Sequence, residues 1–394
     1  MKPSEHTMTF ARDLTEVTLG LDLLYRKDLP PDEGPDSLVR REGLVAINLS
    51  KRQPRPFRSW EEGEAALRDL AGRALVLPEG DRRVYYGEFV DSLAALAQWH
   101  TRGMSFPEQI SRFIHVAAQP VSDEVLEGYR QSLSPLLAAA GYRGDLTSMV
   151  LAWQDRHRIP EERLEEVFMA LQAEGRRRSL RLFDLPDDPG MSLVGLHGVS
   201  YNAYCDYVGR KMYLNLDGEY TVPSMKHLVA HEIYPGHYVH MILRETLAAE
   251  GIAPEDVNLV VTDTASSATF EGIAEQGIHF LDWMDGADDE IGMLLNGLRS
   301  ALGCNASWRL HRLKQPVAQV GEFLKTEGMG NAGWVAARLR MLTYPLRAPF
   351  IYAYWYGDHA VEQVWRRVPA SRRADFFPYL YARLHSPRSL ELFT

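Results

Sequence analysis

One pattern dominates the first half of the chain and restricts the folds that are open to it. Apolar residues recur at helical spacing in segments that end at proline-marked loops, and acidic residues open several of these segments, as helix N-termini prefer. None of the segments carries a cluster of ligand-type side chains. The pattern predicts a mainly α fold in which residues 1–185 form a helical scaffold and one wall of a cleft. The expected helices cover residues 8–25, 60–75, 86–100, 106–116, 122–140 and 160–174.

The turn-rich segment 184–190 marks a change in the chain. Two strand-like segments follow, at 204–208 and 211–216, and Gly209-Arg210 between them suits a hairpin turn. We expect residues 186–394 to form a catalytic, metal-binding region, with a small β-hairpin beside the helix that carries the site.

Composition and charge exclude several classes of protein. The 394 residues are 45% hydrophobic and 24% charged, which is typical of a globular chain. The net charge of −10 argues against broad binding to nucleic acid or to anionic membranes. Only Cys205 and Cys304 are present, so no disulfide framework holds the fold. Neither a secretory signal nor a membrane-spanning run is visible, and we expect a cytoplasmic location and no membrane partner.

The chemistry of the chain is concentrated in the segment that starts at Ser224. It contains His231-Glu232 and, six residues after the first histidine, His237. Zinc sites of hydrolases use His and Glu ligands, and the usual His-Glu-x-x-His spacing works because residues i and i+4 share one helix face. At i+6, an ideal helix would point His237 about 120° away from His231.

Pro235-Gly236 offers a way around this difficulty. Proline cannot donate a hydrogen bond to the carbonyl four residues before it, here that of His231, and glycine tolerates the backbone departure that follows. A kink at this point would bring His237 back toward His231. A histidine-rich core helix with an incidental glutamate is the alternative reading of the spacing.

A third ligand is expected from a later helix. Glu271, Glu275 and His279 follow one another at intervals of four residues, so one helix would place them on one face. A solvated stripe would have the same spacing, but the neighbouring residues are mostly small or apolar. We expect Glu271 to be the ligand, with Glu275 and His279 supporting it or facing the substrate.

These motifs resemble a known family. His-Glu-x-x-Pro-Gly-His followed by a downstream Glu-Gly is similar to the signature of the bacterial domain-of-unknown-function 885 family, whose members are mostly helical and resemble zinc peptidases with two His and one Glu as ligands. The resemblance covers about residues 190 to 365 and includes Tyr213-Leu214-Asn215 and the segment 353–357. Tyr238, His240 and Ile273 depart from the family pattern, which argues against a shared substrate.

The resemblance implies a role for each matching residue. One zinc ion would be held by His231, His237 and Glu271, and Glu232 would be the general base. Tyr354 matches a late tyrosine of the family and would stabilise an oxyanion, although its aromatic neighbours are equally typical of core packing.

Substrate contacts are expected nearby. The strand 211–216 would be an edge on which an extended peptide pairs, with Tyr213 and Asn215 facing it, and His240 would lie near the same cleft. Arg347 and Arg210 would bind a carboxylate if the enzyme is an exopeptidase.

Three functions remain open on the sequence alone. The first is a zinc-dependent hydrolase of amide bonds, most simply a peptidase of small peptides. The second keeps the metal but acts on a non-peptide acyl or amide metabolite, because function depends on the pocket and not on the scaffold. The third is a helical binding protein with a dead site, which the joint presence of His231, Glu232, His237 and Glu271 argues against.

Overall fold

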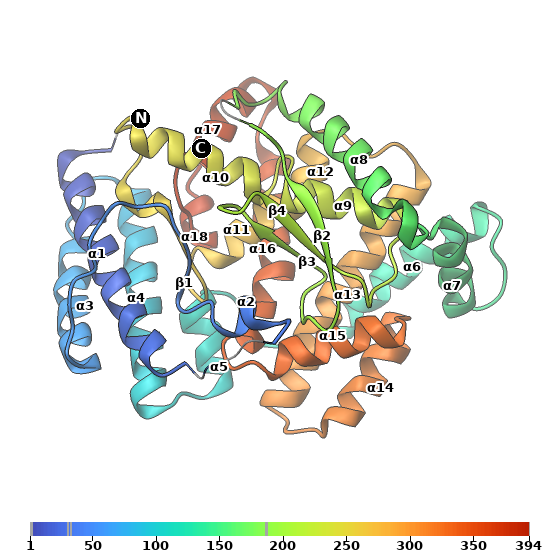
Figure 1. Ribbon diagram of the computed structural model, residues 1–394, viewed down its shortest axis with the longest axis horizontal. Helices are drawn as coiled ribbons and strands as arrows, with labels where there is room; N and C mark the ends of the chain where they lie inside the picture. The colour runs from blue at the N-terminus through green and yellow to red at the C-terminus, as the bar shows by residue number, and fades with distance from the viewer. Residues whose placement is uncertain (1–2, 30, 32–33, 186–187, 394) are drawn as a thin grey trace. The chain divides into compact units, whose positions relative to one another are not determined.

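A computed structural model describes residues 3–29, 31, 34–185 and 188–393. The chain is mainly α-helical, as the sequence predicts, with few strands (Figure 1). It divides into two compact units, and both of the regions expected from the sequence, 1–185 and 186–394, contribute to each unit. No described helix combines the length and the apolar character that crossing a bilayer requires.

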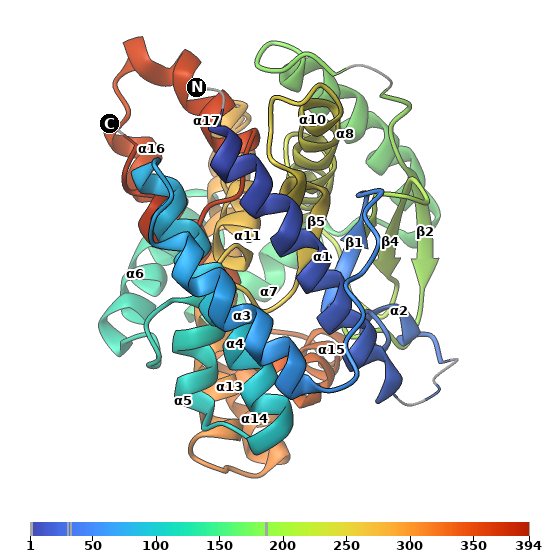
Figure 2. The same ribbon diagram turned by 90° about the vertical axis from the view of Figure 1, so that its left-hand side faces the viewer.

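The first unit comprises Met1–Ala118, His240–Ile273 and Tyr352–Thr394. Helices α1 (Glu5–Lys27), α3 (Trp60–Ala74) and α4 (Gly80–Arg102) pack side by side in it (Figure 2). Their apolar residues supply much of the buried core of this unit. Strands β1 (Val45–Asn48) and β5 (Leu259–Val261), which the sequence did not indicate, pair antiparallel. The helices contained wholly in this unit are α1 (Glu5–Lys27), α2 (Ser37–Arg40), α3 (Trp60–Ala74), α4 (Gly80–Arg102), α5 (Phe106–Gln109), η1 (Ile110–Ile114), η3 (Glu255–Asn258), η4 (Ala370–Arg372), α17 (Arg373–Tyr381) and α18 (Pro387–Leu390).

The second unit comprises Gln119–Val239 and Ala274–Ile351. The long helix α13 (Ala287–His311) packs against α6 (Asp123–Ala139), α9 (Val222–Glu232) and α14 (Val317–Gly328), and α8 (Leu164–Ser179) packs against α9. Helix α7 (Leu146–His157) lies outside the helices expected from the sequence. The helices contained wholly in this unit are α6 (Asp123–Ala139), α7 (Leu146–His157), η2 (Glu161–Arg163), α8 (Leu164–Ser179), α9 (Val222–Glu232), α12 (Gly277–Phe280), α13 (Ala287–His311), α14 (Val317–Gly328) and α15 (Ala332–Thr343).

A three-stranded sheet in the second unit contains the expected hairpin. Strands β3 (Ala203–Asp206) and β4 (Lys211–Asn215) pair antiparallel, and β3 packs against α9. Strand β2 (Ser192–Leu196) adds to the other side of β4 in parallel, so the order is β2-β4-β3 (Figure 1). The prediction that strand 211–216 is a free edge is therefore wrong, because β4 is hydrogen-bonded on both sides.

Three helices continue from one unit into the other. They are α10 (His237–Ala249), α11 (Ser267–Glu275) and α16 (Arg347–Arg367). All three carry residues of the expected site.

Candidate metal centre

The helix that carries His231 and Glu232 ends where the sequence predicts a break. A capping box at Thr221 and Ser224 starts α9, which runs to Glu232, and α10 begins at His237. Between them, Pro235 follows a cis peptide bond and the Gly236 amide donates to the carbonyl of Ala230 over 3.0 Å. The chain therefore turns sharply instead of continuing as one helix.

This turn brings the two motif histidines together. The ring centroids of His231 and His237 are 4.7 Å apart, with the rings nearly perpendicular at 87°. Both side chains are buried, with 6% and 8% of their surface exposed. The i+6 spacing is thus compatible with a shared site because the Pro-Gly turn replaces the helical path between the two residues.

Helix α11 supplies two carboxylates, Glu271 and Glu275, one helical turn apart and both buried. His227, His231 and Glu275, all in the second unit, place one ligand atom each within 4.8 Å of one another. Glu271 belongs to the first unit.

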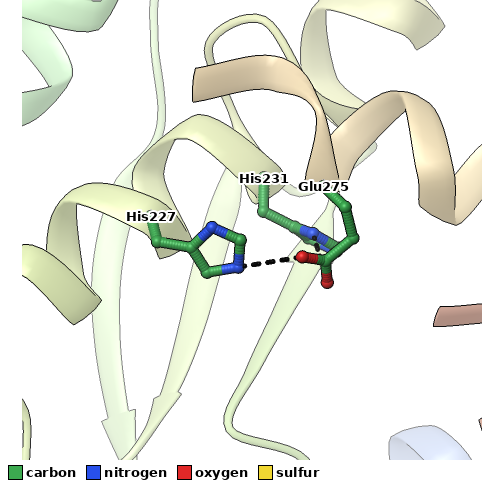
Figure 3. Close-up of side chains that lie close together, drawn as sticks. All are labelled: His227, His231 and Glu275. Atoms are coloured by element: carbon green, nitrogen blue, oxygen red, sulfur yellow. Dashed lines mark ion pairs between the residues drawn. The ribbon is translucent and has the colours of Figure 1, made fainter. Parts of the chain in front are cut away.

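Glu275 is already engaged by side chains of its own unit. Its Oε1 lies 3.4 Å from His231 Nδ1, and its Oε2 lies 3.2 Å from His227 Nε2 (Figure 3). Asn296 of α13 completes the cluster, because its Nδ2 lies 3.1 Å from Glu275 Oε2 and 3.2 Å from His227 Nε2. A carboxylate held in this way is typical of a group that orients a histidine ligand through the ring nitrogen remote from the metal.

The charge of Glu275 fits that position. Burial alone would raise the pKa of this carboxyl, but the nearby imidazoles of His227 and His231 outweigh burial and lower it. Glu275 is therefore an anion between two imidazoles. An anionic partner on Nδ1 of His231 favours the tautomer that leaves Nε2 available as a ligand atom.

Glu232 lies at the end of α9, with 7% of its surface exposed. Burial and the charge of Glu232 raise the pKa of the Cys205 thiol on β3, and both also raise the pKa of Tyr204. The hairpin is therefore close enough to Glu232 for their charges to interact. Strand β3 packs against α9, the helix that carries the proposed base.

The donor set fits a zinc ion. Two imidazoles and one carboxylate, all buried, are the ligands of catalytic zinc sites that keep one position open. Glu275 is held in the His227–Glu275–Asn296 cluster of the second unit. The assignment of Glu271 as the third ligand remains a prediction.

Two residues expected to face the substrate have structural roles instead. Asn215 is buried, its Nδ2 donates to the carbonyl of Val199, and its Oδ1 accepts from the Asp217 amide at 3.0 Å. Asn215 thus holds the turn after β4 and is not available to a substrate. Tyr213 lies in the middle strand opposite Tyr204 and Val194, where its backbone pairs with neighbouring strands.

His279 does not continue the row of Glu271 and Glu275. Helix α11 ends at Glu275, Gln276 begins the short helix α12, and His279 is exposed while both carboxylates are buried. The prediction that the three side chains share one helix face is wrong for His279, because the helix is interrupted. His240 is buried in the first unit against the rings of Phe270 and Tyr381.

The remaining expected residues both lie on α16. Arg347 begins this helix, and its guanidinium lies 5.1 Å from the ring centroid of Phe350. Tyr354 is half-buried in the part of α16 that belongs to the first unit. The roles expected of Arg347 and Tyr354 remain predictions.

Two members of the cluster, His227 and Asn296, were not expected from the sequence. His227 precedes His231 by four residues on α9, so the helical period was a signal that could have identified it. Asn296 carries no such signal, because only the packing of α13 against α9 brings it to the cluster.

No family model matches the chain, and no curated protein matches it. Its structure is similar to that of a candidate lipoprotein from Colwellia psychrerythraea, with a TM-score of 0.54 and 18% identity over 84% of this chain and 58% of that one. A candidate lipoprotein of unknown function from Shewanella oneidensis aligns with a TM-score of 0.48 and 12% identity over 84% of this chain and 70% of that one. The chain spans 58% of the length of the Colwellia protein, and the likeness concerns the fold alone.

Proposed function

We propose that this protein is a zinc-dependent hydrolase of amide bonds that acts on small peptides. His231, His237 and Glu271 would hold the metal, and Glu232 would be the general base. The observation that carries the proposal is the 4.7 Å approach of the His231 and His237 rings across the Pro235-Gly236 turn. The burial of all four side chains supports it, since buried ionisable groups are otherwise costly.

A bound zinc ion would polarise the substrate carbonyl and lower the pKa of a water ligand. Glu232 would accept a proton from the attacking water and then deliver it to the departing amine as the carbon–nitrogen bond breaks. The step balances, because the hydroxyl of the water joins the carbonyl carbon and its other proton passes through Glu232 to the departing amine.

Glu275 and His227 would keep His231 in place during this reaction. The contacts of Glu275 with His231 and with His227 and Asn296 hold the imidazole of His231 from the side remote from the metal. The rigid attachment of this cluster to α9, α11 and α13 would preserve the geometry of the donors.

The test is metal content combined with turnover. Purified wild type and His237→Ala are each incubated with zinc, freed of excess metal and measured by elemental analysis, and both are then assayed on a panel of small peptides. About one zinc per chain in the wild type, lost in His237→Ala together with peptide hydrolysis, is the expected result. Wild-type protein that takes up no zinc would overturn the proposal and favour a helical binding protein.

A metal-loaded wild type with no peptidase activity would overturn the substrate assignment alone. Hydrolysis of non-peptide amides or esters by that protein would then place it among hydrolases of acyl metabolites. Failure of the metal site and failure of the substrate assignment therefore give different results.

A further inference from the structure

Arg210 lies in the turn between β3 and β4, and its backbone is firmly held. It adopts a left-handed conformation with φ of +55°, and its carbonyl accepts a hydrogen bond of 3.0 Å from the Ser192 amide on β2. The neighbouring Gly209 amide donates to Asp206 Oδ1 over 2.8 Å. The direction in which the Arg210 side chain leaves the turn is therefore fixed by the sheet.

Two tyrosine rings hold the guanidinium of Arg210. Its central carbon lies 4.5 Å from the ring centroid of Tyr207 and 5.0 Å from that of Tyr238. Both tyrosines are buried, with 3% and 0% of their surface exposed, and cation–π contacts of this kind orient a guanidinium without using its N–H donors.

One nitrogen of this guanidinium is not satisfied within the described part of the chain. Nη1 of Arg210 is buried and has no hydrogen-bond partner among the residues that the structure describes. A buried donor without a partner carries a free-energy cost. A ligand that supplies acceptors would remove that cost.

Two acidic residues whose charges act on Cys205 and Tyr238 alongside that of Arg210 have hydrogen-bond partners of their own. Asp206 accepts from the turn, and Asp188 accepts from the Tyr234 hydroxyl at 2.6 Å and from Arg176 Nε at 2.7 Å. Neither carboxylate is paired with Arg210, so its guanidinium can bind an external anion.

Arg210 lies close to the proposed catalytic residues of the same unit. Tyr238, against which it packs, directly follows His237 at the start of α10. The Cys205 thiol on β3 has a pKa that burial and Glu232 raise and that Arg210 lowers, so both charges reach the same point of the hairpin. A molecule that contacts Arg210 would therefore extend toward Glu232.

We propose that Arg210 binds a carboxylate of the substrate, and that the substrates are peptides or N-acyl amino acids with a free α-carboxylate beside the bond that is cleaved. Arginine suits this role because its planar fork can make two parallel hydrogen bonds to one carboxylate. The inference rests on the proposed function for the cleavage step, but the carboxylate site itself does not depend on it.

The first test measures binding without turnover. Isothermal titration of metal-free protein with N-acetylalanine and N-acetylphenylalanine, each compared with its C-terminal amide, should show tighter binding of the acids to the wild type. Arg210→Gln should lose at least about 30-fold in affinity for the acids, as truncation of one partner of a charged hydrogen-bonded pair does, and little for the amides.

Two further variants control for charge and for geometry. Lys211→Gln removes the same charge from the next residue, which is exposed, and should bind as the wild type does. Arg210→Lys keeps the charge without the planar fork and should recover only part of the affinity. Melting temperatures of all variants near that of the wild type would exclude a folding defect.

Equal binding of acids and amides by the wild type, or an unchanged preference in Arg210→Gln, would overturn the proposal. The second test uses zinc-loaded protein. It compares the rate of hydrolysis of acetylated dipeptides with the rate for the same dipeptides amidated at the C-terminus. Equal hydrolysis of both would overturn the carboxylate site and leave the proposed function intact. If the protein binds the acids through Arg210 but hydrolyses no amide, the carboxylate site stands and the proposed function is overturned.

Discussion

The carbonyl oxygen of His231 occupies the space that a Cβ at Gly236 would need. A Cβ built on Gly236 would lie only 1.6 Å from this oxygen, far inside any real contact. The close approach exists because the chain turns back on the end of α9 before it enters α10. The same turn brings the His231 and His237 rings together, so this glycine and the proposed metal centre depend on one backbone path.

Gly236→Ala should therefore damage both stability and metal binding. We expect a loss of about 2–4 kcal/mol in the free energy of unfolding, since the backbone of His231 cannot yield as a flexible side chain could. Zinc uptake should fall with it. Urea denaturation and elemental analysis measure the two effects.

Gly87→Ala provides the control, because no atom lies within 4 Å of a Cβ at that position in α4. Alanine there should stabilise the protein slightly, by roughly 0.5–1 kcal/mol. An equal, small effect of both substitutions would contradict the close approach at Gly236.

The two carboxylates of α11 should respond differently to mutation. Glu271→Ala should abolish zinc binding, because it removes a ligand. Glu275→Gln should keep one zinc per chain at saturation but weaken the affinity by about 10- to 100-fold, as loss of a partner behind a ligand does. Competition with a chromophoric chelator measures both affinities.

Glu290→Gln on α13 removes an exposed carboxylate and should leave the affinity unchanged. Retention of zinc in Glu271→Ala together with its loss in Glu275→Gln would reassign the metal to His227, His231 and Glu275. That result would contradict the ligand assignment but not the presence of a metal.

Glu232→Gln should separate metal binding from catalysis. The amide preserves the size of the side chain but cannot accept a proton, so we expect unchanged zinc content and a fall in kcat of about 10²- to 10⁴-fold. Normal turnover in this variant would refute the assignment of Glu232 as base.

Asp263 gives a prediction about pH. The side chain is fully buried at a φ of +55°, and neither carboxyl oxygen has a hydrogen-bond partner among the described residues. Burial raises the pKa of Asp263 well above its ordinary value. The folded state thus keeps a proton that the unfolded chain releases near pH 4, and the stability contributed by this group falls as the pH rises above that value.

Asp263→Asn should remove this dependence. Asparagine accepts a positive φ and cannot ionise, so the variant should be more stable than the wild type at pH 7, by at least about 1.4 kcal/mol, which corresponds to one pKa unit. The difference should shrink as the pH approaches 4. Melting curves between pH 4.5 and 7.5 measure it, and a constant difference across this range would contradict the prediction.

Local patterns in the sequence determined most of the helices. The periodic segments 8–25, 60–75 and 122–140 correspond to α1, α3 and α6 to within a few residues, because each buries one continuous face. The helix break at Pro235-Gly236 and the β3–β4 hairpin around Gly209-Arg210 were also predictable, since proline and glycine restrict or free the backbone wherever they occur.

Tertiary structure decided what the local pattern cannot specify. Strands β1, β2 and β5 are short and find their partners far along the chain or across a loop, so no hydrophobic alternation marked them. The pairing of β2 with β4 made the expected edge strand central and left Asn215 holding a turn. The interruption of α11 at Gln276 exposed His279. Only the packing of α13 against α9 brought Asn296 to His227 and Glu275, because a contact between residues 69 positions apart is set by the arrangement of helices and not by their spacing in the sequence.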